Sequence, residues 1–234
     1  MKAFRRIDKI YETTINIAKT FGKKIVVADI ATDHGFIAEK IASSEIIEKV
    51  IATDISEKSL SKLEKLIKLK KLEKIETLVG DGLEPIQSVD ICVIAGIGGF
   101  EIRKMIENQN KTDSGVKSKI FILQPAQNPV ELREWIFDNK FKVLCDITIE
   151  DSERFYAITA IDVSEFEETE KSLFNLWIGR DSRENKQDFC NYLEYLREYL
   201  RFSENVLPSR IENDKMLLQK CELYKKIDSY LTDN

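Results

Sequence analysis

The hydrophobic positions of this chain change their period several times along the sequence. Apolar residues recur at helical spacing over residues 4–21, which predicts an amphipathic helix. Five short apolar runs follow and are typical of strands buried on both faces, at residues 25–30, 50–55, 75–79, 89–95 and 120–123. Helical patterns separate them or follow them, at residues 37–42, 56–72, 100–107 and 130–139. This alternation predicts an α/β fold with a mostly parallel, Rossmann-like sheet and helices on both faces.

The last part of the sheet is expected to be antiparallel. Apolar and polar residues alternate over 141–149 and over 154–163. The short acidic turn 150–153 joins the two segments, which is typical of a hairpin. An acidic break at 165–170 then predicts a domain boundary, with one domain over residues 1–163 and a second over 164–234.

The second domain is predicted to be a C-terminal helical hairpin, coiled-coil-like, whose two long helices are broken near Pro208. Its apolar stripes could pack on each other and on the main domain, or pair with a second subunit. We favour the first arrangement and a monomer.

Composition excludes several classes of protein. The 234 residues are 43% hydrophobic with only 9 Gly and 4 Pro, which excludes disordered and collagen-like chains. No apolar run approaches the roughly 20 residues that cross a bilayer, and the amino terminus carries charge where a signal peptide is apolar. The 4 cysteines are scattered, without the spacing of a metal site or a disulfide scaffold. We therefore expect a soluble, cytoplasmic protein without a structural metal.

The net charge of −5 is unevenly distributed. Residues 1–24 hold an excess of positive charge, with Arg5, Arg6 and Lys9 on one helix face, and a second lysine-rich stretch runs over residues 58–74. Both stretches could be ordinary solvated helix faces, or they could contact the phosphates of a nucleic acid.

Candidate chemistry lies where the predicted strands end. Three successive strands are each followed by, or end on, an aspartate, namely Asp29, Asp54 and Asp81. In open parallel sheets, ligands bind beyond the carboxyl ends of the strands. A single aspartate there is usually a cap or turn former, but three in the same register favour a binding site. Asp33 is expected to be the N-cap of the following helix, with His34, the only histidine, in its first turn.

The charge of this predicted site indicates which nucleoside it binds. Carboxylates in the first turn would repel a dinucleotide's diphosphate, whereas S-adenosylmethionine carries a sulfonium and an ammonium and no phosphate. Asp54 is placed to accept hydrogen bonds from ribose hydroxyls, and Asp81 to receive the adenine amine. Gly96, Gly98 and Gly99 would let the backbone approach the ligand, or would simply form a tight turn.

Four segments together carry a family resemblance: Asp-Ile-Ala-Thr-Asp-His-Gly at 29–35, Gly-Asp-Gly-Leu-Glu at 80–84, Ile-Ala-Gly-Ile-Gly-Gly at 94–99 and Leu-Gln-Pro at 123–125. The chain resembles the bacterial tRNA (adenine-N1)-methyltransferases that modify adenine 22. The resemblance implies a class I methyltransferase fold, S-adenosyl-L-methionine as methyl donor and tRNA as partner. The positions it implies for the donor are Asp29, Asp33, His34, Asp54, Ile55, Asp81, Gly82, Ala95, Gly96, Gly98 and Gly99.

The sequence departs from this family at three places. Ala31-Thr32 stands where the family usually has Gly-Ser, and Asp54 where it has Glu or Asn. Ala126 stands where it has an asparagine, so Gln124 or Asn128 would have to replace any hydrogen bonds of that side chain to the target base.

The implied reaction is an attack of adenine N1 on the donor methyl, without a metal. Asp29 or Asp33 could ease the developing positive charge, and His34 could move a proton. Tyr156, Phe100 and Phe36 are candidates to stack on the base, although aromatic residues are more often part of the core or the rim. Two alternatives remain: a methyltransferase acting on another RNA or a small molecule, and a non-catalytic RNA-binding protein.

Overall fold

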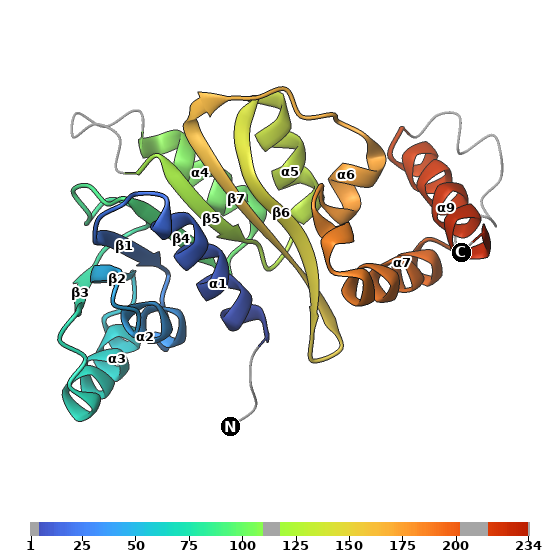
Figure 1. Ribbon diagram of the computed structural model, residues 1–234. Helices are drawn as coiled ribbons and strands as arrows, with labels where there is room; N and C mark the ends of the chain where they lie inside the picture. The colour runs from blue at the N-terminus through green and yellow to red at the C-terminus, as the bar shows by residue number, and fades with distance from the viewer. Residues whose placement is uncertain (1–4, 110–117, 202–214, 234) are drawn as a thin grey trace.

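The computed structural model of the protein describes residues 5–109, 118–201 and 215–233. Seven strands in these ranges form one sheet in the order β3-β2-β1-β4-β5-β7-β6 (Figure 1). The pairs among β1 to β5 are all parallel, whereas β7 pairs antiparallel with both β5 and β6. The predicted Rossmann-like sheet with a terminal hairpin is therefore confirmed. The strands are β1 (Ile25–Ile30), β2 (Ile47–Asp54), β3 (Ile75–Val79), β4 (Ile91–Ala95), β5 (Ile120–Gln124), β6 (Phe141–Asp151) and β7 (Arg154–Phe166).

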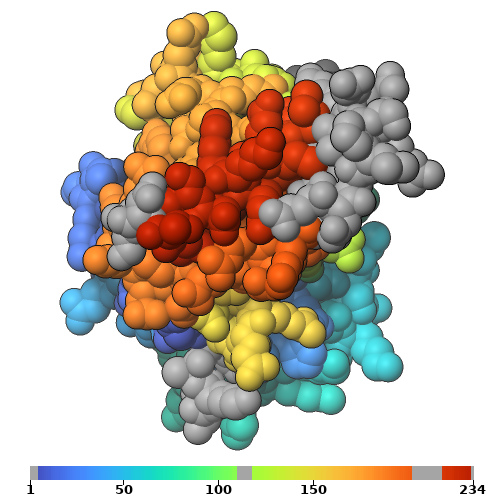
Figure 2. Space-filling view, turned by 90° about the vertical axis from the view of Figure 1, so that its right-hand side faces the viewer, coloured from blue at the N-terminus to red at the C-terminus, as the bar shows by residue number. Residues whose placement is uncertain are grey.

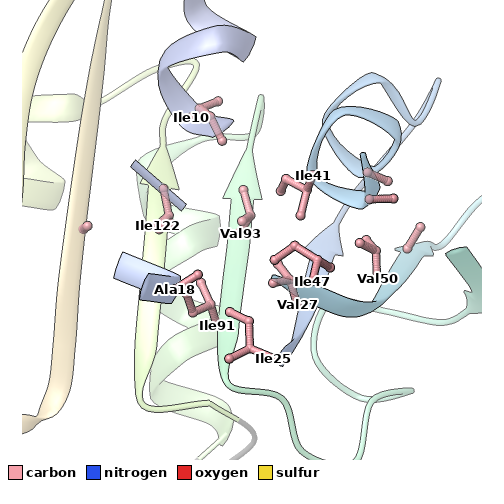
Figure 3. Packing of buried hydrophobic residues seen from close by; sticks show 14 of the residues in the cluster. Ile10, Ala18, Ile25, Val27, Ile41, Ile47, Val50, Ile91, Val93 and Ile122 are labelled. Carbon is pink, nitrogen blue, oxygen red and sulfur yellow. The ribbon is translucent and has the colours of Figure 1, made fainter. Parts of the chain in front are cut away.

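Alternate side chains of the strands build one hydrophobic core on each face of the sheet. On the first face, Val27 and Val93 pack with Ile10 and Ile41 from two of the helices (Figure 3). On the second face, Ile94 packs with residues of two further helices. The helices of the first face are α1 (Arg5–Lys19), α2 (Phe36–Ala42) and α3 (Glu57–Lys70), and those of the second are α4 (Gly99–Gln109) and α5 (Pro129–Asp138).

In the described ranges, four further helical segments follow the sheet: α6 (Leu173–Ile178), the 3-10 turn η1 (Ser182–Glu184), α7 (Lys186–Leu200) and α9 (Lys215–Asp233). In Figure 2, α9 lies in red over the orange part of the chain that holds α6 and α7. Leu193 and Leu196 of α7 and Leu223 and Ile227 of α9 are buried in one cluster. The apolar stripes therefore pack on each other within the chain, as predicted, whereas the expected break near Pro208 lies outside the described residues.

A buried ion pair fastens this C-terminal part to the sheet. Nε of Arg133 on α5 lies 2.9 Å from Oδ1 of Asp146 on β6, and both side chains are almost fully buried. The same guanidinium donates to the carbonyl oxygens of Leu176 and Trp177, at the end of α6. A side chain at Gly179 would lie 2.8 Å from the arginine, so this position requires glycine. These contacts attach α6 to the sheet. Strand β7 continues to Phe166, three residues past the domain boundary expected at residue 163.

The order of the strands decides where a ligand can enter. From β1 the chain builds outward through β2 to β3, and then returns to β4 on the other side of β1. The loops that leave the carboxyl ends of β1 and β4 therefore diverge, and an open crevice between such loops is where parallel α/β sheets bind ligands.

Candidate functional site

A cavity of about 380 Å³ opens at the carboxyl edge of the sheet, between the ends of β1 and β4. The turn after β1 lines it with Asp29, Asp33 and His34, and the end of β4 contributes Ala95 and Gly96. Arg6 and Ile7 of α1, Phe36 of α2 and Gln124 at the end of β5 complete much of its wall. The structure therefore has a cavity at the place in the sheet topology where the sequence predicts the ligand site.

Asp29 lies at the floor of this site with 2% of its surface exposed. Its Oδ2 accepts a hydrogen bond of 2.5 Å from the hydroxyl of Thr32 and one of 3.2 Å from the backbone amide of Ala38. Burial raises the pKa of Asp29 to about 7; the two hydrogen bonds oppose this shift and the nearby charge of Asp54 adds to it. Near neutral pH, the carboxyl can therefore be charged or neutral in response to what occupies the cavity.

The turn that follows β1 has an unusual backbone. Ala31 has φ 57° and Asp33 has φ 45°, the left-handed region that non-glycine residues rarely adopt, and Gly35 follows at φ 72°. Gly35, not Asp33, is the N-cap of α2, and the amide of Ala38 in the first turn of this helix donates to Asp29 instead. The prediction of an Asp33 cap is therefore wrong. The left-handed turn instead directs the backbone amide of Asp33 toward the carboxyl end of β2.

Asp54, the last residue of β2, links this strand to the turn after β1. Its Oδ2 accepts a hydrogen bond of 3.1 Å from the amide of Asp33, and its Oδ1 accepts one of 2.8 Å from the amide of Ser56. The carboxylate remains only half-buried, and Ile55 beside it is 72% exposed. Asp54 is thus fixed in orientation by two backbone amides, next to an exposed apolar side chain.

Asp81 lies at the same carboxyl edge of the sheet but lines a different cavity. The amide of Gly80 donates to the carbonyl oxygen of Asp54, which ties the turn after β3 to the end of β2. Asp81 and Gly82 line a second cavity of about 280 Å³, together with Met105 and other residues of α4. The structure therefore gathers Asp29, Asp54 and Asp81 at one edge of the sheet, where Asp29 lines the first cavity and Asp81 lines the second.

The three glycines after β4 have different roles. Gly96 has φ 82° and a side chain there would meet nothing within 4 Å, so this position opens on the cavity. A side chain at Gly99 would lie 2.6 Å from the carbonyl oxygen of Asn128, and one at Gly98 would meet the carboxylate of Glu101. Gly99 therefore lets the loop at Asn128 approach closely, while Gly96 leaves room for a ligand.

Arg6 reaches into the cavity from α1. Its Nη1 donates a hydrogen bond of 3.1 Å to Oε1 of Gln124, and its guanidinium carbon lies 5.0 Å from the centre of the Tyr156 ring. Gln124 is fully buried, and its amide nitrogen donates to the carbonyl oxygen of Pro125. The predicted substrate residues Arg6, Gln124 and Tyr156 thus form one contact group.

The other cations of α1 are placed differently. Arg5 binds Asp188 through both terminal nitrogens, at 3.0 and 2.9 Å, and also donates to the carbonyl oxygen of Glu150. Lys9 lies 3.3 Å from Glu12 on the surface. Arg5 therefore joins α1 to α7, whereas Lys9 faces solvent.

The remaining candidates for the target base lie at the rim of the cavity or outside it. Nδ1 of His34 is 2.5 Å from Oδ2 of Asp33, and the His34 ring stacks on Phe36 with centroids 5.8 Å apart. Phe36 is 52% exposed, as is Phe100 at 54%, but Phe100 does not line this cavity. Asn128 has a left-handed backbone, makes no side-chain cap bond and lines a separate hollow beside α7.

Sequence reasoning missed the polar residues that hold the carboxylates. Thr32 and Ser56 each bond to an aspartate of the site, as described above. Their spacing from these aspartates, three and two residues, is the signal that could have found them. Across the ranges 5–109, 118–201 and 215–233, no group of three or more metal-ligating side chains could hold an ion. Nor does any helix in the same ranges have the length and hydropathy to cross a membrane.

Comparison with solved structures supports the fold over almost the whole chain. The Mycoplasma capricolum TrmK structure holds S-adenosyl-homocysteine and is 19% identical, with a TM-score of 0.73 over 97% of this chain and 96% of that one. The Streptococcus pneumoniae protein Sp1610, in complex with S-adenosyl-L-methionine, is 21% identical, with a TM-score of 0.75 over 95% and 98% of the two chains. The second of these proteins thus holds the expected donor, and the first holds the product that remains after the methyl group has left.

Sequence comparison identifies the family itself. The tRNA (adenine(22)-N(1))-methyltransferase of Bacillus subtilis is 24% identical over 160 residues, which are 67% of this chain and 66% of that protein. The curated relatives with detectable similarity are matched over 62% to 70% of their own lengths. A family model described as a methyltransferase domain matches residues 12–159, well over half of the chain. This chain therefore belongs to the methyltransferase-domain family, and within it resembles the bacterial tRNA (adenine-N1)-methyltransferases, as its motifs predicted.

Proposed function

We propose that this methyltransferase transfers a methyl group from S-adenosyl-L-methionine to N1 of an adenine in tRNA, at position 22. The observation that carries the proposal is the gathering of Asp29, Asp33 and Asp54 at the carboxyl edge of β1 and β2, beside a cavity at the switch between β1 and β4. The similarity to the B. subtilis enzyme supports the choice of tRNA and of adenine 22.

The residues present fit this donor. Asp29 and Asp33 offer carboxylates to an ammonium or sulfonium group, which a site for a diphosphate would not do. Asp54 is held by the amides of Asp33 and Ser56 in a position to accept hydrogen bonds from ribose hydroxyls. The open space at Gly96 lets the ligand lie against the backbone.

The proposed reaction needs positioning more than acid–base catalysis. When bound, the donor supplies an electrophilic methyl on sulfur, so that the N1–carbon bond forms as the carbon–sulfur bond breaks. N1 attacks with a lone pair, so no proton has to leave the base before transfer. The methylated adenine carries the positive charge, which Asp33 at the rim of the cavity would stabilise. His34, held by Asp33 and stacked on Phe36, extends the same rim toward the base.

N1 lies on the Watson–Crick edge of adenine, so the base must leave its stack and enter the cavity mouth. Phe36 presents an exposed ring at this mouth and supplies a stacking surface. Lys58, Lys62 and Lys65 are exposed on α3, which begins directly after Asp54 and Ile55, and would contact tRNA phosphates. Of the three residues of α1 that the sequence analysis names as phosphate contacts, Arg5 is paired with Asp188 and Arg6 lines the cavity, so we assign the RNA contact to Lys9 at the surface.

The proposal is tested by following the methyl group. The protein is incubated with donor labelled in the methyl group and an unmodified tRNA transcript, and a second transcript carries guanine in place of adenine 22. The tRNA is digested and its nucleosides are separated. We expect labelled 1-methyladenosine from the first transcript only. Label in another nucleoside or in both transcripts would contradict the adenine 22 assignment, and absence of label from every RNA would contradict the proposed activity.

A further inference from the structure

Resting on the proposed function, we propose that the hollow between α5, α7 and α9 binds an unpaired base of the RNA substrate by stacking on Tyr195. This hollow has a volume of about 610 Å³, and its lining residues differ from those of the cavity at the end of β1. Tyr192, Tyr195 and Tyr199 of α7 line it together with Trp177. A second base contact would let the enzyme recognise the RNA around the methylated adenine.

The first argument is the exposure of aromatic rings on α7. Leu193 and Leu196 of this helix are buried in the cluster shared with α9, whereas Tyr195 and Tyr199 are 50% and 47% exposed. Burial of a large aromatic ring stabilises a fold, so rings kept half-exposed side by side in a hollow are typical of a binding surface.

The second argument is the geometry of these rings. The Tyr195 ring is nearly parallel to the rings of Tyr192 and Tyr199, at interplanar angles of 14° and 13°, with centroids 6.0 and 6.2 Å away. The centroid of Phe155 on β7 lies 5.1 Å from that of Tyr195 and supports the ring from the sheet. The tyrosines therefore form a stepped stack along one helix face. A flat base that enters the hollow continues this stack, which is how proteins hold unpaired bases.

The third argument is that the charges of the hollow suit a base better than a phosphate. Glu131 of α5 is exposed and has no hydrogen bond or ion pair with any other described residue. Glu134 lies 3.0 Å from Lys171, and Lys220 of α9 lies 5.9 Å from the centre of the Trp177 ring. The two carboxylates would repel a phosphate, whereas the N–H groups on the edge of a base can donate to Glu131. Lys220 supplies the cation for the backbone of the same nucleotide.

The hollow also adjoins the proposed site of methyl transfer. Gln124 at the end of β5 lines the first cavity, and Asn128, four residues further along the chain, lines the hollow. Four residues span at most about 14 Å, which is about the length of four stacked nucleotides at about 3.4 Å each. We therefore expect the bound base to lie within about four nucleotides of the target adenine.

The first part of the test removes the flat ring from the protein. The affinity for an unmodified tRNA transcript is measured for the wild type and for Tyr195→Leu, which keeps an apolar side chain. We expect this affinity to fall by about 5- to 100-fold. Tyr195→Phe keeps the ring and should bind as the wild type does. Phe166→Leu removes an exposed ring at the far end of β7 and is the matched control. All three variants should keep the wild-type affinity for S-adenosyl-homocysteine, which shows that they are folded.

The second part removes the base from the RNA. Each of the four nucleotides on either side of adenine 22 is made abasic in turn, which leaves the phosphates in place. At one of these positions the wild type should lose as much affinity as Tyr195→Leu loses on intact tRNA. Tyr195→Leu should bind that transcript no more weakly than the wild type does, because the two changes remove the same contact.

Other outcomes would overturn the inference. An equal loss in Tyr195→Phe would assign the effect to the hydroxyl group, and an equal loss in Phe166→Leu would indicate a general effect. Additive losses at all abasic positions would mean that Tyr195 holds none of these bases. Unchanged tRNA affinity in Tyr195→Leu, with methylation of tRNA by the wild type, would leave the hollow to another occupant, such as a protein segment. If the wild type neither bound nor methylated tRNA, the proposed function itself would fail.

Discussion

The backbone amide of Asp33 donates a hydrogen bond to the carboxylate of Asp54, and this bond joins the turn after β1 to the end of β2. Asp54 therefore has two tasks in the proposed account. It holds the left-handed turn that shapes the cavity, and it presents the rest of its carboxylate to the ribose.

The first prediction concerns Asp54→Ala. The change removes the acceptor for the amides of Asp33 and Ser56 and the proposed ribose contact. Hydrogen bonds to a charged group contribute about 1.5–3 kcal/mol each, so we expect affinity for S-adenosyl-homocysteine to fall by about 10- to 100-fold. Calorimetry measures this directly. Glu57→Gln, an exposed acid three residues further on, is the matched control and should leave the affinity within about twofold.

The second prediction is a pH dependence from Asp29, whose pKa is raised by burial to about 7. A ligand that carries an ammonium prefers the ionised carboxyl, so affinity for S-adenosyl-homocysteine should rise as the pH increases from about 6 to 8 and then level off. In Asp29→Asn this rise should be absent. An equally steep rise in the variant would assign the titration to another group.

The third prediction concerns the stability of the same variant without ligand. Burial raises the pKa of Asp29 from its ordinary value of 3.8 to about 7 in the folded protein, so the folded state binds the proton more tightly than the unfolded chain. Stability is therefore lost as the pH rises from about 4 to about 7. The asparagine side chain would keep an oxygen to accept from Thr32 and Ala38, so Asp29→Asn should raise the free energy of unfolding at pH 8 by about 1–3 kcal/mol. Urea denaturation at pH 8 and pH 5 tests the sign, because the gain should shrink at pH 5.

Much of this site could be predicted from the sequence, since the carboxyl ends of parallel strands meet at one edge. That rule correctly brought Asp29, Asp54 and Asp81 together. The position of Asp33 could not be predicted in the same way, because the turn uses left-handed backbone at Ala31 and Asp33, where neither residue type signals it. The pattern therefore suggested a helix cap where the structure has a hydrogen bond from the turn after β1 to the end of β2.

Other parts depend on tertiary packing that no local pattern encodes. Arg5 and Arg6 are neighbours in the sequence, yet one binds Asp188 and the other enters the cavity, because their directions depend on how α1 crosses the sheet. The segment α6 has only six residues, which is too short for a helical period to stand out. The attachment of α6 through Arg133 could not be predicted from the sequence either, because arginine side chains are rarely buried.

The fourth prediction uses the strained turn. Ala31 adopts φ 57°, which glycine would adopt without a side-chain penalty, and glycine is the residue usual at this place in the resembling family. Ala31→Gly should therefore raise the free energy of unfolding by about 0.5–1 kcal/mol. Ala38→Gly on the neighbouring helix α2 is the opposite control and should destabilise, because glycine is unfavourable inside a helix and a buried methyl is lost. A destabilising effect of Ala31→Gly would show that the alanine side chain contributes packing that outweighs the strain.

The fifth prediction concerns RNA contact by α3. Lys62→Glu combined with Lys65→Glu reverses two exposed charges in the middle of α3, a helix that begins at the carboxyl edge of the sheet. We expect weaker tRNA binding with a reduced dependence on salt, and unchanged affinity for S-adenosyl-homocysteine. Lys119→Glu alters an exposed lysine at the opposite edge, before β5, and serves as control. Equal weakening by both sets of changes would point to a general charge effect and not to a contact on α3.

The most direct test of the account is a crystal structure of this protein grown with S-adenosyl-homocysteine. We expect ribose hydroxyls within hydrogen-bond distance of Asp54 and the amino-acid part of the ligand in the cavity between the ends of β1 and β4. Density for the ligand at any other place on the molecule, or a ribose that makes no contact with Asp54, would contradict it.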